Sequence, residues 1–280
     1  MSRHETIQHV SSTALLAAGW SAMECSRPDA LFQDPFAAGL AGEGGLRSAR
    51  DLPDGAWVVA IRTVVIDAFL RSAISSGIDT IVNLGAGLDT RPYWMDLPSS
   101  LRWVEVDHPS LIEGKKAQLR DEAPACAVER FGLDLAERGA RQELFDRLGA
   151  TSTRAMALTE GVVSYLSVDE AGALADDLHA QPSFEVWVTE YLSPQRLRYY
   201  QKHQPLHRVP VRFDPVSCEA FFADHGWRVR EIRYLGEESQ RLRRPVPLPL
   251  FAKVMHPFMS QAKRQQMLQD MGYAVLERAA

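Results

Sequence analysis

Short apolar runs alternate along the chain with longer segments of helical periodicity. This alternation is typical of βαβ units, in which helices cover both faces of a mostly parallel sheet. We expect strands at Thr80–Leu84, Arg102–Asp107, Ala127–Phe131, Arg154–Leu158, Phe184–Glu190, Trp227–Tyr234 and Tyr273–Glu277. The pattern therefore predicts an α/β, Rossmann-like fold with a seven-stranded, mostly parallel sheet.

Helical patterns lie before and between these strands. We expect helices at Ala56–Ser76, Pro109–Glu122, Glu137–Leu148, Val168–Ala180 and Pro215–His225. The clearest start signal is Ser167, an N-cap residue followed by the first-turn acids Asp169 and Glu170. The stretches Gly39–Gly55 and Leu235–Pro249 are the most irregular of the chain, but neither is typical of an interdomain linker.

The chain is long enough to bury a sizeable core, and we expect residues 1–280 to form one domain. Residues 1–76 are predicted to form a helical cap and a lead-in helix, and residues 77–280 the Rossmann-like core. The cap could cover the ligand cleft or pack only on the core. Segment 192–214, after the fifth strand, is expected to be an insertion that reaches over the substrate cleft or forms a solvated helix and loop.

The strongest chemical signal is the glycine turn that follows the strand at 80–84. Gly85 and Gly87 lack a Cβ, so the backbone can turn sharply and approach a ligand closely. Position 90 is Thr, where the fingerprint for dinucleotides has a third glycine. The turn therefore fits a nucleoside without a pyrophosphate better than a nicotinamide dinucleotide. An NAD-dependent oxidoreductase stays as an alternative, together with a cofactor-binding protein that has no catalytic activity.

Acidic residues recur at the ends of successive predicted strands. Asp107 ends the second strand, about twenty residues beyond the glycine turn, which is the spacing expected for a ligand of ribose hydroxyls. Glu105 lies on the alternate face of that strand and is the poorer candidate. Asp134 and Glu160 follow the third and fourth strands, at the edge where open α/β sheets bind ligands. Each acid taken alone could instead cap a helix.

Several segments carry a specific resemblance to a known family. They are Asn83–Arg91 (NLGAGLDTR), Val104–Pro109 (VEVDHP) and Leu158–Leu166 (LTEGVVSYL), with Arg27–Pro35 and Ala60–Asp67 upstream. They resemble motifs of the leucine carboxyl methyltransferase-like family, which includes bacterial methyltransferases of natural-product pathways. The similarity spans about residues 12 to 190.

This resemblance implies a class I methyltransferase that uses S-adenosylmethionine and releases S-adenosylhomocysteine. It implies that Arg62 grips the cofactor carboxylate and that Gly85 and Gly87 flank the methionine portion. Arg62 would otherwise be an unexplained cation in an apolar helix, because a buried guanidinium needs a partner. The alternative is that it reaches solvent or pairs with an internal acid such as Asp67.

The resemblance also assigns the rest of the cofactor site. Asp107 would hold the ribose, Asp134 and Leu135 would contact the adenine, and Glu160 would line the pocket near the reacting atoms. Where close members of the family often carry Arg, this chain has Ser21. The charge preference for the substrate is therefore left open.

A sulfonium methyl group is already activated, so the protein must mainly align the acceptor and exclude water. A carboxylate is ionised at neutral pH and needs no general base, which suits a sequence without an obvious catalytic dyad. We therefore expect carboxyl O-methylation of a small molecule or a peptide-derived metabolite, with Glu160, Tyr165 and Arg62 around the reacting atoms. A phenol or hydroxyl of a polyketide-type metabolite is the alternative acceptor. Its candidate bases are His108, His203, His207 and Tyr165.

Composition narrows the range of partners. The net charge of -5 argues against nucleic acid as the main partner. The three cysteines show no disulfide or CxxC pattern, and no segment reaches the roughly 18 apolar residues of a membrane span. His203 and His207 have the spacing of helical zinc ligands, but Pro205 opposes a regular helix between them. We expect a cytoplasmic enzyme without a metal, and the oligomeric state stays open.

Overall fold

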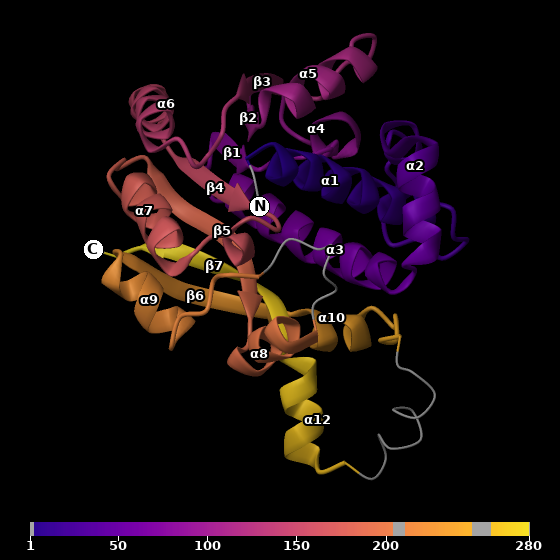
Figure 1. Cartoon of the computed structure of the whole chain (residues 1–280). Coiled ribbons are helices and arrows are strands. Elements are labelled where there is room, and N and C mark those ends of the chain that lie inside the picture. The colour runs from indigo at the N-terminus through magenta and orange to yellow at the C-terminus, as the bar shows by residue number, and fades with distance from the viewer. Residues whose placement is uncertain (1–2, 204–210, 248–258, 280) are drawn as a thin grey trace.

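A single mixed sheet forms the centre of the computed structural model, which describes residues 3–203, 211–247 and 259–279. The strand order is β3-β2-β1-β4-β5-β7-β6 (Figure 1). The strands are β1 (Thr80–Leu84), β2 (Arg102–Asp107), β3 (Ala127–Gly132), β4 (Ala155–Thr159), β5 (Phe184–Leu192), β6 (Trp227–Tyr234) and β7 (Met271–Arg278). Strands β1 to β5 are parallel, and only β7 runs antiparallel to its neighbours. The predicted Rossmann-like sheet is confirmed.

The strand limits follow the sequence pattern closely for some strands and less closely for others. Strands β1, β2 and β6 begin and end at the predicted residues. Strand β5 continues to Leu192 and β7 starts at Met271, because these two residues pair at the end of the antiparallel ladder. Pairing with a partner distant in sequence therefore lengthens both strands beyond their apolar runs.

Helices cover both faces of the sheet. They are α1 (Arg3–Cys25), α2 (Ala37–Asp51), α3 (Asp54–Ser75), α4 (Arg91–Trp94), α5 (Pro109–Gln118), α6 (Arg138–Thr151), α7 (Val168–His179), α8 (Pro194–His203), α9 (Cys218–Asp224), α10 (Leu235–Arg241) and α12 (Gln261–Leu268), with a 3-10 turn, η1, at Val163–Tyr165. Helices α6, α7 and α9 bury one apolar face, and α3 and α10 bury the other. The predicted cap at Ser167 is confirmed, because its hydroxyl accepts from the Glu170 N–H while the Glu170 carboxylate accepts from the Ser167 N–H.

The prediction of irregular structure was wrong for most of Gly39–Gly55 and for the first half of Leu235–Pro249. Most of Gly39–Gly55 belongs to α2, and Leu235–Pro249 begins with α10, although its last residues lie outside the described part of the chain. The glycines that obscure the periodicity of α2 serve close packing against α1. A Cβ on Gly45 would lie 2.6 Å from the carbonyl oxygen of Leu15. Only Gly42, with φ of +59°, interrupts the helix.

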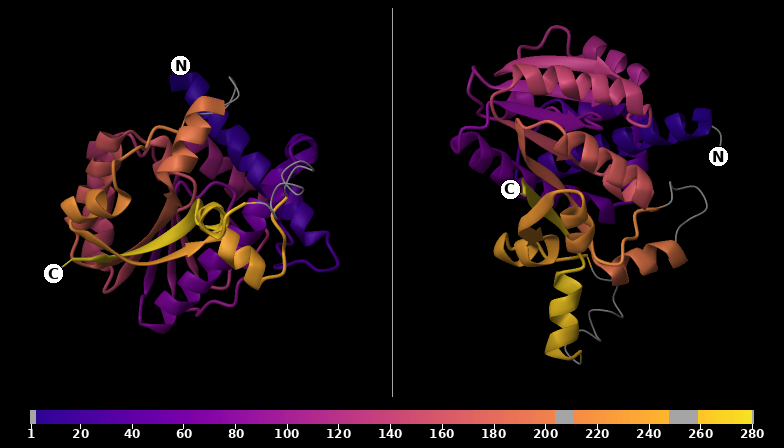
Figure 2. Two further views of the ribbon diagram at one scale, coloured as in Figure 1. Left: turned by 90° about the horizontal axis from the view of Figure 1, so that it is seen from below. Right: turned by 90° about the vertical axis from the view of Figure 1, so that its left-hand side faces the viewer.

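Helices α1, α2 and α3 form a layer at the carboxyl edge of strands β1 and β4 (Figure 1). Helix α1 packs along both α2 and α3 and crosses above the glycine turn, whereas α12 extends away from the sheet (Figure 2). The predicted boundary between the helical segment and the Rossmann-like core, at residue 76, lies at the end of α3. That the whole chain forms one domain stays a prediction. No helix among the described residues has the length and apolar character to cross a membrane.

Candidate active site

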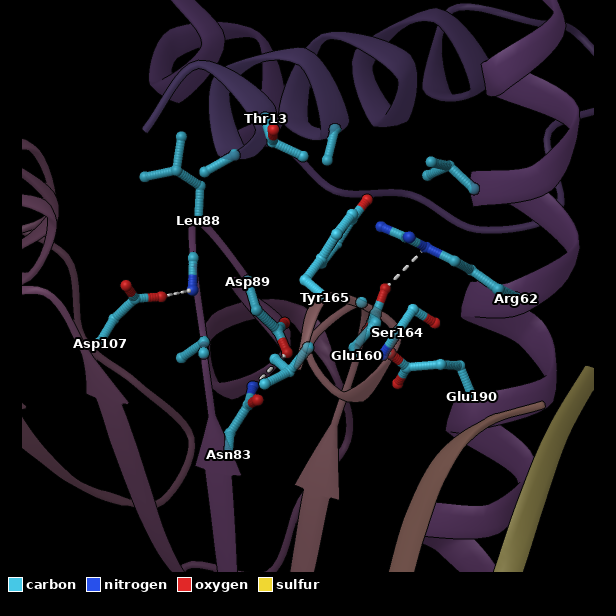
Figure 3. Close-up of a pocket in the computed structure, with 18 of the residues that line it drawn as sticks. Thr13, Arg62, Asn83, Leu88, Asp89, Asp107, Glu160, Ser164, Tyr165 and Glu190 are labelled. Atoms are coloured by element: carbon cyan, nitrogen blue, oxygen red, sulfur yellow. Dashed lines mark hydrogen bonds and ion pairs between the residues drawn. The ribbon is translucent and has the colours of Figure 1, made fainter. Parts of the chain in front are cut away.

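A cavity of about 1610 Å³ opens at the carboxyl ends of the parallel strands. Strand β1 lies between β2 and β4, so the chain reverses direction across the sheet at this point. Such switch points are where open α/β sheets bind ligands. Every residue predicted to bind the cofactor lines this one cavity, as does Tyr165 (Figure 3).

The glycine turn needs its two glycines for different reasons. Gly85 has φ of +68°, and a Cβ there would overlap Cγ2 of Val162. Gly87 has φ of +53°, but a Cβ there would lie at an ordinary contact distance of 3.6 Å from the Cβ of Ala14. Gly85 is therefore required by space and by conformation, whereas Gly87 is required mainly by its left-handed backbone.

Asp107 fastens the glycine turn to the end of β2. Its Oδ2 accepts from the Gly87 N–H at 2.7 Å, and its Oδ1 accepts from the His108 N–H at 2.7 Å. Burial raises the pKa of Asp107, and the two backbone N–H groups oppose that shift. A carboxylate can accept about four hydrogen bonds, so Asp107 can accept about two more from a ligand in the cavity.

The residues predicted to contact the adenine lie beyond Asp107, after β3. Asp134 accepts from the Ala136 N–H at 3.0 Å, and its Oδ2 lies 3.9 Å from Nε2 of His108. Leu135 lines the cavity beside them. The structure thus brings Asp107, Asp134 and Leu135 to the same side of the cavity, and their contacts with a ligand stay predictions.

On the other side of the glycine turn, Glu160 lies between two arginines. Nε of Arg62 is 2.8 Å from Oε1 of Glu160, and Nη1 of Arg91 is 2.9 Å from Oε2. Arg62 thus pairs with an internal acid, as the alternative interpretation of the sequence allowed, but that acid is Glu160 and not Asp67, which accepts from Nε of Arg91 at 2.7 Å. Glu160 is therefore held in place by a cation on each of its oxygens.

Arg91 is the central cation of this cluster, and the sequence analysis gave it no role. It is buried and also donates from Nη1 to Asp89 at 2.7 Å. Burial acts to lower the pKa of Arg91, but the nearby Asp89 and Glu160 carboxylates raise it well above its usual value. The available signal was an Asp-Thr-Arg run directly after the glycine turn, together with a lone acid, Asp67, in an apolar helix.

Arg62 has the right exposure to meet a ligand. Its side chain is 20% exposed, and its terminal nitrogens point into the cavity (Figure 3). The Nε of Arg62 is close to Glu160 but is not aligned for a hydrogen bond. Burial acts to lower the pKa of Arg62, and Glu160 raises it. A guanidinium fork beside a carboxylate fits the two charged groups of an α-amino acid.

We call the part of the cavity beyond Glu160 the acceptor end. Here Ser164 of η1 lies beside Glu190, which comes from the carboxyl end of β5, whereas Tyr165 points toward the end of the Arg62 side chain (Figure 3). The Ser164 N–H donates to Oε1 of Glu190 at 2.8 Å. Glu190 was not selected from the sequence, although it ends the predicted strand Phe184–Glu190 as Asp107 ends its own strand. The imidazole of His203 and all of His207 lie outside the described residues, so their roles as bases stay predictions.

The insertion after β5 also reaches this end of the cavity. Tyr200 of α8 and Arg212 line it, with residues 204–210 between them outside the described part of the chain. Ser21 of α1 lines the cavity with a neutral hydroxyl. Among the described residues, no group of three or more His, Cys, Asp or Glu side chains could hold a metal ion.

Comparison with known proteins identifies the family to which this chain belongs. The sequence model of the leucine carboxyl methyltransferase family matches residues 14–179, which is more than half of the chain. The chain belongs to this family. It is 30% identical over 258 residues to a protein of Parafrankia sp. named "Putative S-adenosyl-L-methionine-dependent methyltransferase", covering 85% of this chain and 83% of that one. A protein of the same name from Mycobacterium marinum is 29% identical over 274 residues, covering 86% and 87%.

Solved structures agree in fold. A DUF574 family protein from Streptomyces avermitilis aligns with a TM-score of 0.58 and 15% identity, covering 93% of this chain and 96% of that one. A protein from Thermobifida fusca, titled a methyltransferase, aligns with a TM-score of 0.54 and 17% identity, covering 85% and 90%. The chain is therefore an S-adenosylmethionine-dependent methyltransferase with a class I fold. The cluster of Arg62 and Glu160 fits the methionine end of this cofactor.

Proposed function

We propose that this methyltransferase transfers a methyl group to an oxygen atom of a small-molecule acceptor. The observation that carries the proposal is the single cavity of about 1610 Å³, in which the cofactor residues occupy one side and a separate acceptor end the other. Ligand pockets of about 300–1,000 Å³ are usual, so this one has room for two molecules at once. A cavity of this kind suits a metabolite better than a nucleic acid.

The order of strands supports this division. Residues predicted for the adenine and ribose follow β3 and β2, and those predicted for the methionine follow β1 and β4. Strand β5 is next in the sheet, so an acceptor placed in line with the methyl group would lie over β4 and β5. When bound, S-adenosylmethionine supplies a methyl group on a positively charged sulfur, and transfer forms a C–O bond, breaks the C–S bond and leaves that electron pair on sulfur.

The protein's own residues would align the reactants. The Arg62 fork would fix the direction of the methionine arm, with Glu160 next to its ammonium group, and the acceptor end would hold the oxygen in line. The contacts from Arg62 at 2.8 Å and from Arg91 at 2.9 Å already hold the Glu160 carboxylate in one position before a ligand binds.

Two acceptor chemistries fit O-methylation. A carboxylate, favoured by the sequence analysis, needs no base, and the description of the matching family names carboxyl methylation. A hydroxyl needs a group that takes its proton, and the position of Glu190 at the acceptor end favours this second candidate. In both cases we propose a metabolite of a natural-product pathway as the acceptor.

The experiment uses S-adenosylmethionine with an isotopically labelled methyl group and paired panels of aromatic carboxylic acids and phenols. Mild alkali releases labelled methanol from a methyl ester but not from a methyl ether, so it identifies the acceptor oxygen. We expect labelled product that is abolished by excess S-adenosylhomocysteine. Label recovered on nitrogen, sulfur or carbon would show that the enzyme is not an O-methyltransferase.

A further inference from the structure

Glu190 is the carboxyl group of the acceptor end that the cofactor contacts do not use. It lies near the carboxyl end of β5, and its side chain points toward Ser164 and the cavity (Figure 3). Glu160, which follows the neighbouring strand β4, pairs with Arg62 instead. The two carboxylates therefore occupy neighbouring places but have different surroundings.

The contacts of Glu190 hold its carboxylate against the turn that carries Ser164. Oε1 accepts from the Ser164 N–H at 2.8 Å, and Oε2 lies 3.5 Å from the Thr189 hydroxyl. Among the described residues, no cation forms an ion pair with Glu190. The Ser164 carbonyl accepts from the Arg212 N–H at 2.9 Å, which holds the turn that presents Ser164.

The environment of Glu190 explains what it can bind. Burial raises its pKa, while hydrogen bonds from Ser164 and the Val162 backbone oppose that shift. Tyr273, whose pKa burial raises strongly, lies close enough to interact with Glu190, with Arg62 and with Glu160. Arg62 and Arg91 are engaged by Glu160, and Arg212, which also lines this end of the cavity, pairs with Glu170 at 3.0 Å. A second carboxylate brought into this space would meet Glu190 as a like charge.

Resting on the O-methyl transfer proposed above, we propose that Glu190 accepts the proton of an acceptor hydroxyl, so that the acceptor is a phenol and not a carboxylate. Four tyrosines are among the residues that line the cavity: Tyr165, Tyr191, Tyr200 and Tyr273. Aromatic rings prefer to pack against one another, so these side chains favour an aromatic ring that carries the hydroxyl.

The step balances without a further reactant. The O–H bond breaks, its proton moves to Oε2 of Glu190, and the electron pair left on the oxygen forms the new bond to the methyl carbon. The electrons of the broken C–S bond stay on sulfur and neutralise its charge. Glu190 then returns the proton to water.

Binding tests the proposal without turnover. The probes are 2-naphthol and 2-naphthoate, which share a ring system, measured against protein saturated with S-adenosylhomocysteine. Because like charges at about 5 Å repel even at a high effective dielectric constant, we expect wild-type protein to bind naphthol about tenfold more tightly or better. Glu190→Gln keeps an acceptor for the Ser164 N–H but removes the charge, and should erase most of this preference.

Glu185→Gln is the matched control, because Glu185 lies on the same strand but pairs with Arg154, away from the cavity. It should keep the wild-type preference. Wild-type protein that binds naphthoate as tightly as naphthol, or a Glu190→Gln variant that keeps the preference, would overturn the proposal.

Turnover gives a second, independent readout. Glu190→Gln should lower ether formation about 10²–10⁴-fold, the usual contribution of a general base, with cofactor affinity within about twofold of wild type. The wild-type kcat/KM should fall on acidification as Glu190 is protonated, and the variant should lack this limb. Glu190→Asp, which keeps a carboxylate, should recover part of the rate.

The outcomes separate the two proposals. Methyl ester formation that Glu190→Gln leaves unchanged would preserve O-methylation and refute the role of Glu190. Equal losses of turnover and cofactor affinity in Glu190→Gln, with a lowered melting temperature, would make Glu190 a structural residue. Label on an atom other than oxygen would refute the proposed function itself.

Discussion

Replacing Arg91 with lysine tests whether the buried ion cluster organises the cofactor site. Arg91 donates to Asp67 and Asp89 at 2.7 Å and to Glu160 at 2.9 Å, using two different nitrogens. Lysine keeps the charge, but one ammonium nitrogen cannot take both positions. Because Nη1 alone makes two of the three hydrogen bonds, we expect lysine to leave one or two of them unmade. Because a hydrogen bond to a charged group contributes about 1.5–3 kcal/mol, the free energy of unfolding should fall by about 1.5–6 kcal/mol.

Thermal and urea denaturation measure this decrease. For a chain of this size we expect the melting temperature to fall by about 3–24 °C. Arg71→Lys is the control, since Arg71 is 58% exposed and lies 3.9 Å from Asp67, and it should change stability by less than about 0.5 kcal/mol. S-adenosylmethionine affinity should fall with Arg91→Lys, because Glu160 loses one of the two cations that hold it.

A double variant isolates the cause. In the Arg91→Lys background, Asp67→Asn removes a buried carboxylate that no longer has its partner, so it should recover part of the stability. In the wild-type background the same change should destabilise the protein. An Arg91→Lys variant that melts within about 2 °C of wild type and binds the cofactor normally would refute the reasoning.

Three further predictions concern cofactor contacts. Asp107→Ala should weaken S-adenosylmethionine binding by roughly 1–3 kcal/mol in calorimetry, and unchanged affinity in a folded variant would exclude the ribose role. Because burial raises the pKa of Asp107, acidification should weaken wild-type binding at a higher pH than an exposed aspartate would, as protonation removes its acceptor capacity. Gly87→Val should abolish cofactor binding but leave the circular dichroism of the sheet largely unchanged, because a β-branched residue is strained at φ of +53°. Arg62→Lys should weaken binding and slow single-turnover transfer despite keeping the charge, whereas reduced stability with intact affinity would mean a structural role.

The sequence predicts well those elements whose own apolar pattern shows that they are buried. Strands β1 and β2 are short runs buried almost throughout, and their limits match the apolar pattern. Helix α2 was missed because its glycines lower helix propensity, whereas in the fold they allow α1 to approach closely. Its stability comes from a neighbouring helix that local periodicity does not reveal.

In the active site, too, residues with a recognisable spacing could be predicted and residues joined only by the fold could not. Asp107 and the glycine turn are twenty residues apart and have a recognisable spacing, so they could be predicted together. The Arg91 cluster joins residues from α3, the glycine turn and the end of β4, and its existence depends on the sheet order. Glu190 is distinguished only by the turn at Ser164 that faces it, which a single sequence does not show.

The two sides of the cavity come from different stretches of the chain. The residues assigned to the cofactor all precede Gly161, inside the 14–179 segment that the family shares. Much of the acceptor end, from Glu190 through Tyr200 and Arg212 to Tyr273, follows that segment. Exchange of the later stretch between relatives can therefore change which metabolite is methylated while the cofactor machinery stays intact. A chimera joined near residue 180 would inherit its acceptor choice largely from the donor of its carboxyl-terminal part.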